Sequence, residues 1–234
     1  MAWTQIGQDI DGTAINTSTG SNVSISGDGQ TVSVITPFSD GSGKYAGNGL
    51  VKTYTINVDG TWSEQGSILG ETDQFIRSAS LSNNGSRLAV GRILGADSSG
   101  TLTGDVRVYQ KLFDASGNVV WTQLGTTIYG EAYNDIFGQA VRLSGDGQTL
   151  LVGAPQSDTG GVDGGEIYFY KYLNGAWTID YSIYAGEGSG LGYDYSFDIS
   201  DDGTVASIGD AEKDLGVDGK GFIVQYRETN DEWG

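Results

Sequence analysis

The segment Phe137–Tyr170, FGQAVRLSGDGQTLLVGAPQSDTGGVDGGEIYFY, is the stretch that decides the fold. It contains two strand-like runs, VRL and TLLV, joined by a Gly-Asp-Gly turn, and a loop rich in glycine and aspartate leads to a third run, EIYFY. Asp-Gly between apolar runs is a strong hairpin signal, because glycine adopts φ > 0 without steric cost. The segment therefore predicts three consecutive antiparallel strands.

The same unit occurs four times in the 234 residues. A tryptophan marks each unit, and successive markers are 59, 59, 56 and 56 residues apart. Every unit has an apolar run that ends in serine, a polar turn, a second apolar run, a long loop and a third run that ends in tyrosine. We expect the marker tryptophan to begin a fourth strand. The markers are Trp3, Trp62, Trp121, Trp177 and Trp233.

Four short antiparallel strands per unit, repeated without helical periodicity, predict an all-β fold, a β-propeller of four-stranded antiparallel blades. The 39 glycines and 2 prolines agree with many tight turns. We predict a single domain over residues 1–234, with repeats of about 56–62 residues at approximately 3–61, 62–120, 121–176 and 177–232. Tryptophans at this spacing are typical of packing between blades, and sugar-stacking platforms are the alternative.

The ring has two predicted ways to end. A strand over Ala2–Ile10 can complete the last blade and hide two sheet edges that would otherwise invite aggregation. Trp233 competes with this arrangement, because it can begin a fourth strand of its own.

Composition excludes several function classes. The formal net charge of −18 makes nucleic acid and anionic lipid poor partners. No apolar run approaches the roughly 20 residues that span a bilayer, and MAWTQIGQDIDG has no secretory signal pattern. Histidine and cysteine are absent, no phosphate-cradling Gly-Lys-Ser/Thr motif occurs, and no carboxylate pair stands out. We therefore expect no enzymatic activity and no membrane insertion.

The long loops between second and third strands hold one aspartate each at matching places. In a propeller these loops emerge on one face, so the four carboxylates are expected to form a ring there. Aspartate in such loops usually accepts hydrogen bonds from its own turn. The alternative is a calcium site at Asp158, Asp163, Asp214 and Asp218, completed by loop carbonyls. The candidate binding aspartates are Asp40, Asp97, Asp158, Asp163, Asp214 and Asp218.

The connections between blades are expected on the same face, and they are rich in tyrosine. Tyr133, Tyr193 and Tyr195 are the candidates for a recognition surface, because tyrosine offers a large contact area with a polar tip. Ordinary surface tyrosines are the alternative.

Phe137-Gly138, followed two strands later by Gly153-Ala154-Pro155, resembles the motif of FG-GAP repeats, the blades of the integrin α-chain propeller. The wider WTQ-x-G pattern is similar to tandem repeats in surface proteins of marine microbes and their viruses. Integrin-type blades often carry a calcium loop between the first two strands. Here that connection is a tight turn, so the family's calcium residues are not carried over to Asp28, Asp146 or Asp202.

Together, the pattern and the resemblance imply a non-catalytic structural or interaction module of a virion or cell surface. Its partner is expected to be a protein, and copies of the chain are expected to be able to assemble. A glycan-binding adhesin or lectin-like propeller, calcium-dependent or not, is the alternative.

Overall fold

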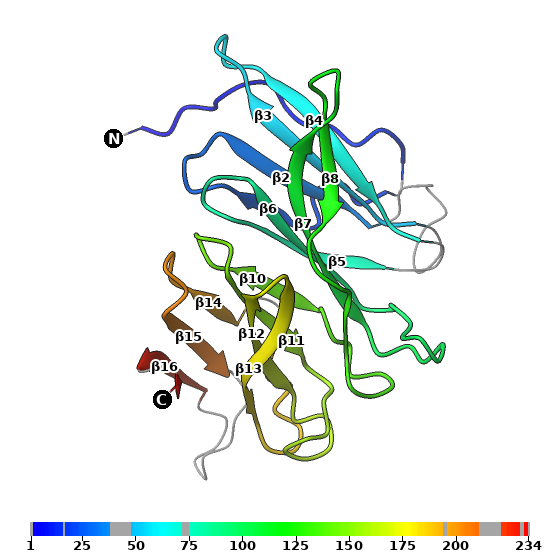
Figure 1. Ribbon diagram of the computed structural model, residues 1–234, viewed down its shortest axis with the longest axis vertical. Coiled ribbons are helices and arrows are strands. Elements are labelled where there is room, and N and C mark those ends of the chain that lie inside the picture. The colour runs from blue at the N-terminus through cyan, green and yellow to red at the C-terminus, as the bar shows by residue number, and fades with distance from the viewer. Residues whose placement is uncertain are drawn as a thin grey trace.

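The computed structural model describes residues 2–15, 17–37, 48–71, 75–193, 196–210, 221–229 and 232–233. These residues form an all-β structure of four antiparallel sheets, which follow one another as blades 1 to 4 (Figure 1). The prediction of a β-propeller-like fold with four-stranded antiparallel blades is thereby confirmed. No helix in the described part of the chain is long and apolar enough to cross a membrane.

Within each blade, neighbouring strands pair in chain order. Blade 1 consists of β1 (Val23–Ile25), β2 (Thr31–Thr36), β3 (Leu50–Ile56) and β4 (Trp62–Leu69). Blade 2 consists of β5 (Ile76–Leu81), β6 (Arg87–Arg92), β7 (Asp105–Phe113) and β8 (Val119–Gln123), with β9 (Ile128–Tyr129) also paired to β7. Blade 3 consists of β10 (Ala140–Leu143), β11 (Thr149–Ala154), β12 (Glu166–Leu173) and β13 (Ala176–Tyr184). Blade 4 consists of β14 (Phe197–Ile199), β15 (Val205–Asp210), β16 (Phe222–Thr229) and β17 (Glu232–Trp233).

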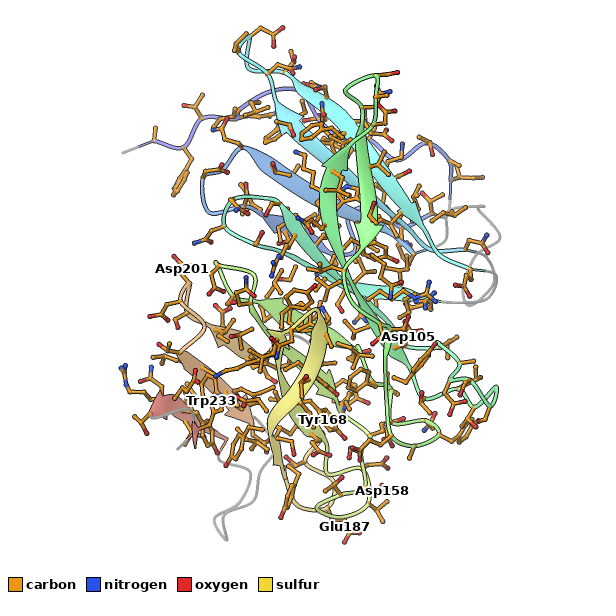
Figure 2. All side chains as sticks on the ribbon, in the orientation of Figure 1. Asp105, Asp158, Tyr168, Glu187, Asp201 and Trp233 are labelled. Atoms are coloured by element: carbon orange, nitrogen blue, oxygen red, sulfur yellow. The ribbon has the colours of Figure 1, made fainter. Side chains whose placement is uncertain are left out.

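The turn between the first two strands has the same hydrogen bonds in every blade. In blade 3 the Ser144 hydroxyl donates to Asp146 Oδ1 and accepts from the Thr149 N–H. A positive φ falls on the last turn glycine alone, Gly147 in this blade, so Asp146 keeps an ordinary backbone conformation. Consecutive turns also touch, since the Asp146 N–H donates to the carbonyl of Asp201, which is labelled in Figure 2. The turn carboxylate therefore holds its own hairpin together.

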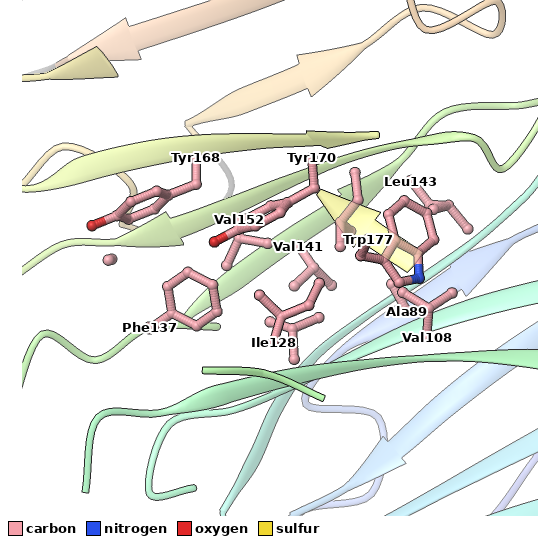
Figure 3. Packing of buried hydrophobic residues seen from close by; sticks show 13 residues of the cluster. Ala89, Val108, Ile128, Phe137, Val141, Leu143, Val152, Tyr168, Tyr170 and Trp177 are labelled. Carbon is pink, nitrogen blue, oxygen red and sulfur yellow. The ribbon is translucent and has the colours of Figure 1, made fainter. Parts of the chain in front are cut away.

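The hydrophobic core lies between blades. Figure 3 shows Val108 and Ile128 of blade 2 packed against Phe137, Val141 and Trp177, which belong to blade 3 or to the connection that leads into it. Alternation along β10 and β11 turns Val141, Leu143, Leu150 and Val152 toward the preceding blade. Phe137 also contacts Tyr168 edge to face at 5.5 Å between ring centroids.

The marker tryptophans bridge neighbouring blades, as expected for packing residues. The Trp177 indole N–H donates to the Leu124 carbonyl, and the Trp121 indole N–H donates to the Thr53 hydroxyl. Trp233, the last residue of β17, is buried against Phe169 of blade 3. Trp3 differs, because its side chain is fully exposed.

The strand predicted over Ala2–Ile10 does not complete the last blade. Residues 2–10 contain no strand and lie against blade 1, where the Gln8 side chain bonds both backbone groups of Trp62. The competing interpretation is the correct one, because β17 supplies a fourth strand of blade 4 and pairs with Glu228 and Thr229. The physical reason is that blade 1 holds the N-terminal segment through Trp62, whose indole N–H donates to the Ile6 carbonyl.

The Phe-Gly and Gly-Ala-Pro motifs are two sides of one contact between blades. A Cβ at Gly91 in β6 would lie 2.1 Å from the carbonyl oxygen of Gly138. A Cβ at Gly153 in β11 would lie 2.4 Å from the carbonyl oxygen of Gly192, at the entry to blade 4. Glycine is required at both positions because a backbone carbonyl of the next blade occupies the space of a side chain.

Candidate functional site

The predicted site residues fall on the long loops and on the connections between blades. The structure describes the long loops of blade 2, between β6 and β7, and of blade 3, between β11 and β12. Of the predicted aspartate ring it therefore places only Asp97 and Asp158. Asp40, Asp214, Asp218 and Tyr195 lie outside the described residues.

Asp97 folds its own loop. Its Oδ1 accepts hydrogen bonds from the Ser99 N–H at 2.8 Å, the Ser99 hydroxyl at 2.6 Å and the Thr101 N–H at 2.9 Å. These donors lower the pKa of Asp97, the Ser99 hydroxyl most of all. The structure thus supports the turn interpretation at Asp97.

Asp158 has the same role in blade 3. Its Oδ1 accepts the Asp163 N–H at 2.9 Å, which closes the loop at the point where Asp163 adopts φ 50°. Figure 2 shows Asp158 at the lower end of the molecule near Glu187. In the described part of the chain, no group of three or more Asp and Glu side chains is arranged to hold a metal ion. In the described half of the predicted calcium site, the Asp158 carboxylate and the Asp163 backbone N–H are thus hydrogen-bonded to each other and hold the loop closed.

A crevice of about 680 Å³ lies where the long loop of blade 3 meets blade 4. It brings together Asp163 and Tyr193, two of the predicted site residues. It also includes three residues that sequence reasoning did not select, Ser189, Leu191 and Asp210. The polar walls of the crevice are completed by Gln156 and Ser196.

Backbone hydrogen bonds preform this crevice. The connection into blade 4 donates from Gly188 to the Val162 carbonyl, from Gly190 to the Asp163 carbonyl and from Leu191 to the Gly164 carbonyl. The Ser189 hydroxyl donates to Asp210 Oδ2. The two loops that form the crevice wall are therefore hydrogen-bonded to each other, so a ligand would not have to order them.

The interior behind the long loop of blade 3 is acidic. Glu166, at the start of β12, is buried, and its Oε2 accepts hydrogen bonds from Ser157, Thr159 and the Tyr168 hydroxyl at 2.8–2.9 Å. Burial and the neighbouring Glu166 raise the pKa of the Tyr168 phenol. Burial also raises the pKa of Asp135 to about 6, with further contributions from nearby carboxylates.

One signal in the sequence points to Glu166. It opens the otherwise apolar run EIYFY, and Asp105 opens the matching run DVRVY in blade 2. A carboxylate at the start of a buried strand must find donors, because an unpaired buried charge is costly. Asp210 and Ser189 have no comparable signal, since their contact joins residues 21 apart in the chain.

Tyr133 stands beside the crevice without lining it. It is exposed on the connection into blade 3, where the Asn134 side-chain amide donates to Gln156 Oε1 at 2.7 Å. Because Gln156 also lines the crevice, this connection abuts the same wall. Tyr193 is itself 40% exposed and offers part of its ring to a ligand.

The crevice offers groups that can hold a ligand by charge, hydrogen bonds and ring contact. Carboxylates at Asp163 and Asp210 attract cations and accept hydrogen bonds, and the Tyr193 ring offers a flat contact for a guanidinium or a sugar. The chain has no histidine or cysteine to act as base or thiolate nucleophile.

Residues 130–170 match the family model of the FG-GAP repeat. The match spans Phe137-Gly138 and Gly153-Ala154-Pro155, and it confirms the resemblance seen in the sequence. FG-GAP repeats generally mediate protein interaction or adhesion, are generally non-catalytic, and typically occur in extracellular or surface proteins.

A solved structure similar to this chain is that of a putative 6-phosphogluconolactonase from Bacteroides uniformis. The TM-score is 0.53 at 11% sequence identity, and the match covers 90% of this chain and 68% of that chain. At this identity the likeness concerns the fold alone, and it agrees with a β-propeller-like architecture. No curated protein sequence matches this chain.

Proposed function

We propose that this chain is a non-catalytic attachment module of a virion or cell surface, and that the crevice between blades 3 and 4 receives a basic side chain of a protein partner. The crevice itself carries the proposal, because it joins Asp163 and Asp210 to the ring of Tyr193 in a preformed wall. The FG-GAP match at residues 130–170 supports an interaction role.

Arginine suits this crevice better than lysine. A guanidinium pairs with carboxylates through a planar fork and also stacks on an aromatic ring. The net charge of −18 draws basic partners toward the whole molecule. Binding is therefore expected to weaken as salt is added.

Selection from a displayed peptide library tests the proposal. Peptides that bind the protein are expected to be rich in arginine, and their affinity is expected to fall about tenfold or more in Asp163→Asn and in Tyr193→Ala. Asp114→Asn, on the hairpin between β7 and β8, removes one carboxylate far from the crevice and serves as the charge-matched control. Equal affinity for all variants would rule out the crevice as the site.

A glycan is the second candidate ligand, favoured by the Ser189 hydroxyl and the Tyr193 ring in one pocket. Saturable binding on a glycan array that disappears in Tyr193→Ala and in Tyr195→Ala would establish a lectin. An array without saturable binding would favour the protein partner.

Calcium binding at Asp214 and Asp218 remains part of this proposal, and both residues lie outside the described residues. Thermal melting with calcium and with a chelator tests it. An identical melting temperature in the two solutions would remove calcium from the proposal.

A further inference from the structure

Three Asn-Gly pairs occur in the chain, at Asn48-Gly49, Asn84-Gly85 and Asn174-Gly175. Such a pair holds both partners of a reaction, because the backbone nitrogen of the glycine can attack the side-chain carbonyl carbon of the asparagine. Glycine has no Cβ to hinder this approach. In a folded protein the reaction requires that the glycine N–H is not held by a hydrogen bond and that the asparagine side chain can turn toward it.

Asn84-Gly85, in the turn between β5 and β6, does not meet these conditions. The Gly85 N–H donates to the Ser82 carbonyl at 2.9 Å. The Asn84 side chain is held as well, since its Oδ1 accepts from the Ser82 hydroxyl and from the Ser86 N–H, both at 3.0 Å. Gly85 is buried against Thr31 of blade 1, so packing between blades also restrains this turn.

Asn48-Gly49, directly before β3, is restrained in another way. Gly49 is buried, and its carbonyl accepts from the Gly70 N–H at 2.6 Å. A Cβ at Gly49 would lie 2.7 Å from the Cβ of Ile76 in blade 2. The backbone at Gly49 is therefore held by contacts in blade 1 and in blade 2.

Asn174-Gly175 forms the two-residue loop of the hairpin between β12 and β13, and both residues are exposed. The φ angle is 52° at Asn174 and 88° at Gly175, as a tight hairpin turn requires. Among the described residues, no backbone carbonyl accepts from the Gly175 N–H, and the Asn174 side chain has no hydrogen-bond partner. Both reacting groups are therefore available in the folded protein.

The corresponding hairpins of blades 1 and 2 are longer and hold their turn residues. Their turn glycines donate to a backbone carbonyl, Gly60 to that of Asn57 and Gly117 to that of Asp114. A carboxylate in each turn, that of Asp59 or of Asp114, also accepts backbone N–H groups. Of these three hairpins, the one in blade 3 is thus the one whose turn glycine N–H is not held.

We propose that Asn174 is a site of spontaneous covalent modification, and that one of its products loosens the contact of blade 3 with blade 2. The Gly175 nitrogen gives up its proton and bonds to Asn174 Cγ, the bond from Cγ to the side-chain nitrogen breaks, and that nitrogen leaves as ammonia. Water then opens the resulting succinimide ring at one of its two carbonyl carbons. Opening at Cγ gives aspartate, and opening at the backbone carbonyl gives isoaspartate.

The two products have different effects on the hairpin. Aspartate tolerates positive φ much as asparagine does, so this product keeps the turn and adds one negative charge. Isoaspartate adds one carbon atom to the backbone of a two-residue loop. The pairing of Leu173 with Ala176 and of Tyr172 with Trp177, which this loop sets, must then strain or shift.

That pairing positions two contacts with blade 2. The Trp177 indole N–H donates to the Leu124 carbonyl at 3.1 Å, and the Arg87 guanidinium lies 5.1 Å from the centre of the Tyr172 ring. The isoaspartate form is therefore expected to pack less well against blade 2. A slow reaction at an exposed turn is in this way coupled to the packing between blades.

Peptide mapping by mass spectrometry, after prolonged incubation of the full chain at mildly alkaline pH, tests the proposal. The peptide with Asn174 is expected to gain about 1 Da, because an amide becomes a carboxyl, and to separate into aspartate and isoaspartate forms. Asn48 and Asn84 are internal controls. Each is expected to react about tenfold or more slowly than Asn174, because its turn must first open locally. In denaturant the three pairs should react at similar rates.

Asn174→Gly is the matched control variant, since Gly-Gly also suits this turn and carries no side-chain amide. The incubated unaltered protein should melt at a lower temperature than the fresh protein, whereas incubated Asn174→Gly should melt as it did when fresh. Equal rates at the three pairs of the folded protein, or an intact Asn174 where the denatured chain is modified, would overturn the assigned site. Formation of isoaspartate without any shift in the melting temperature would overturn the coupling to the blade contact.

Discussion

The second strands of blades 2 and 3 end at equivalent positions of the repeat but carry different side chains there. Blade 2 reads Gly91-Arg92-Ile93 and blade 3 reads Gly153-Ala154-Pro155. The glycine is shared, because each receives a backbone carbonyl from the next blade. The following residue differs, since Arg92 forms a buried ion pair with Asp105 whereas Ala154 leaves Glu166 to three hydroxyl donors.

The two positions of the repeat motif therefore have different roles: the glycine serves packing, and the next residue serves charge balance. The glycine meets a steric demand at the interfaces between blades 2 and 3 and between blades 3 and 4, whereas blade 1 has Ile35 at the equivalent position. The next position decides how the carboxylate at the start of the third strand is balanced. Arg92 supplies a cation to Asp105, whereas in blade 3, where the position is Ala154, hydroxyl groups of other residues bind Glu166. Blade 3 therefore keeps an acidic interior near the crevice, while Arg92 and Arg107 neutralise the equivalent region of blade 2.

Breaking the ion pair of blade 2 is expected to have the largest effect. Arg92→Ala leaves Asp105 buried without its bidentate partner and should lower the free energy of unfolding by about 3–5 kcal/mol. Chemical denaturation measures this loss. Arg92→Ala combined with Asp105→Ala removes both charges and should recover much of the stability, and a double variant as weak as the single one would refute the account.

Filling the shared glycine position should cost somewhat less. Gly153→Ala places a methyl group 2.4 Å from the Gly192 carbonyl oxygen, so blades 3 and 4 must separate, at about 3 kcal/mol. Gly186→Ala is the matched control, because a Cβ there meets no atom within 4 Å. Thermal unfolding of the two variants compares them directly, and equal melting temperatures would contradict the steric explanation.

Replacing the buried Glu166 of blade 3, which is bound by three hydroxyl groups, should lower the stability by less again. Glu166→Gln keeps the shape but replaces an acceptor with an amide that also donates, which leaves donors from Ser157, Thr159 or Tyr168 unmatched. We expect a loss of about 1–2 kcal/mol in the free energy of unfolding. A gain in stability would show that relief of the negative charge outweighs the hydrogen bonds.

The smallest effect is expected from the acidic surroundings of the same loop. The pKa of Asp135 is raised to about 6 in the folded protein, above its ordinary value, so the folded state binds this proton more tightly. Stability from this group is therefore full below about pH 4 and is lost as the pH rises toward 6. Asp135→Asn should remove that loss and raise stability at pH 7 by on the order of 1 kcal/mol.

Denaturation of Asp135→Asn and the unaltered protein at several pH values between 4 and 7 measures the difference. The two curves should meet near pH 4 and diverge as the pH rises. Parallel curves for Asp135→Asn would mean that this carboxyl ionises without a cost to folding.

The candidate site shows where prediction from the sequence stops. Tyr193 and Asp163 were selected from loop composition, and the structure brings both to one crevice. Asp97 was selected on the same grounds, yet it folds its own turn. Composition identifies loops rich in carboxylate and tyrosine, but it does not tell which side chains turn inward, because that depends on hydrogen bonds between separate loops.

The sequence by itself determined the repeat, the strands and the hairpin turns of this protein. These features depend on contacts between residues a few positions apart, such as Ser144 with Asp146, and on alternation along one strand. Tertiary structure alone decided where the N-terminal segment lies and which carboxylates share a crevice. Those outcomes rest on contacts between residues 20 to 60 positions apart, such as Ser189 with Asp210 and Trp62 with Ile6, and local patterns carry no information about their geometry.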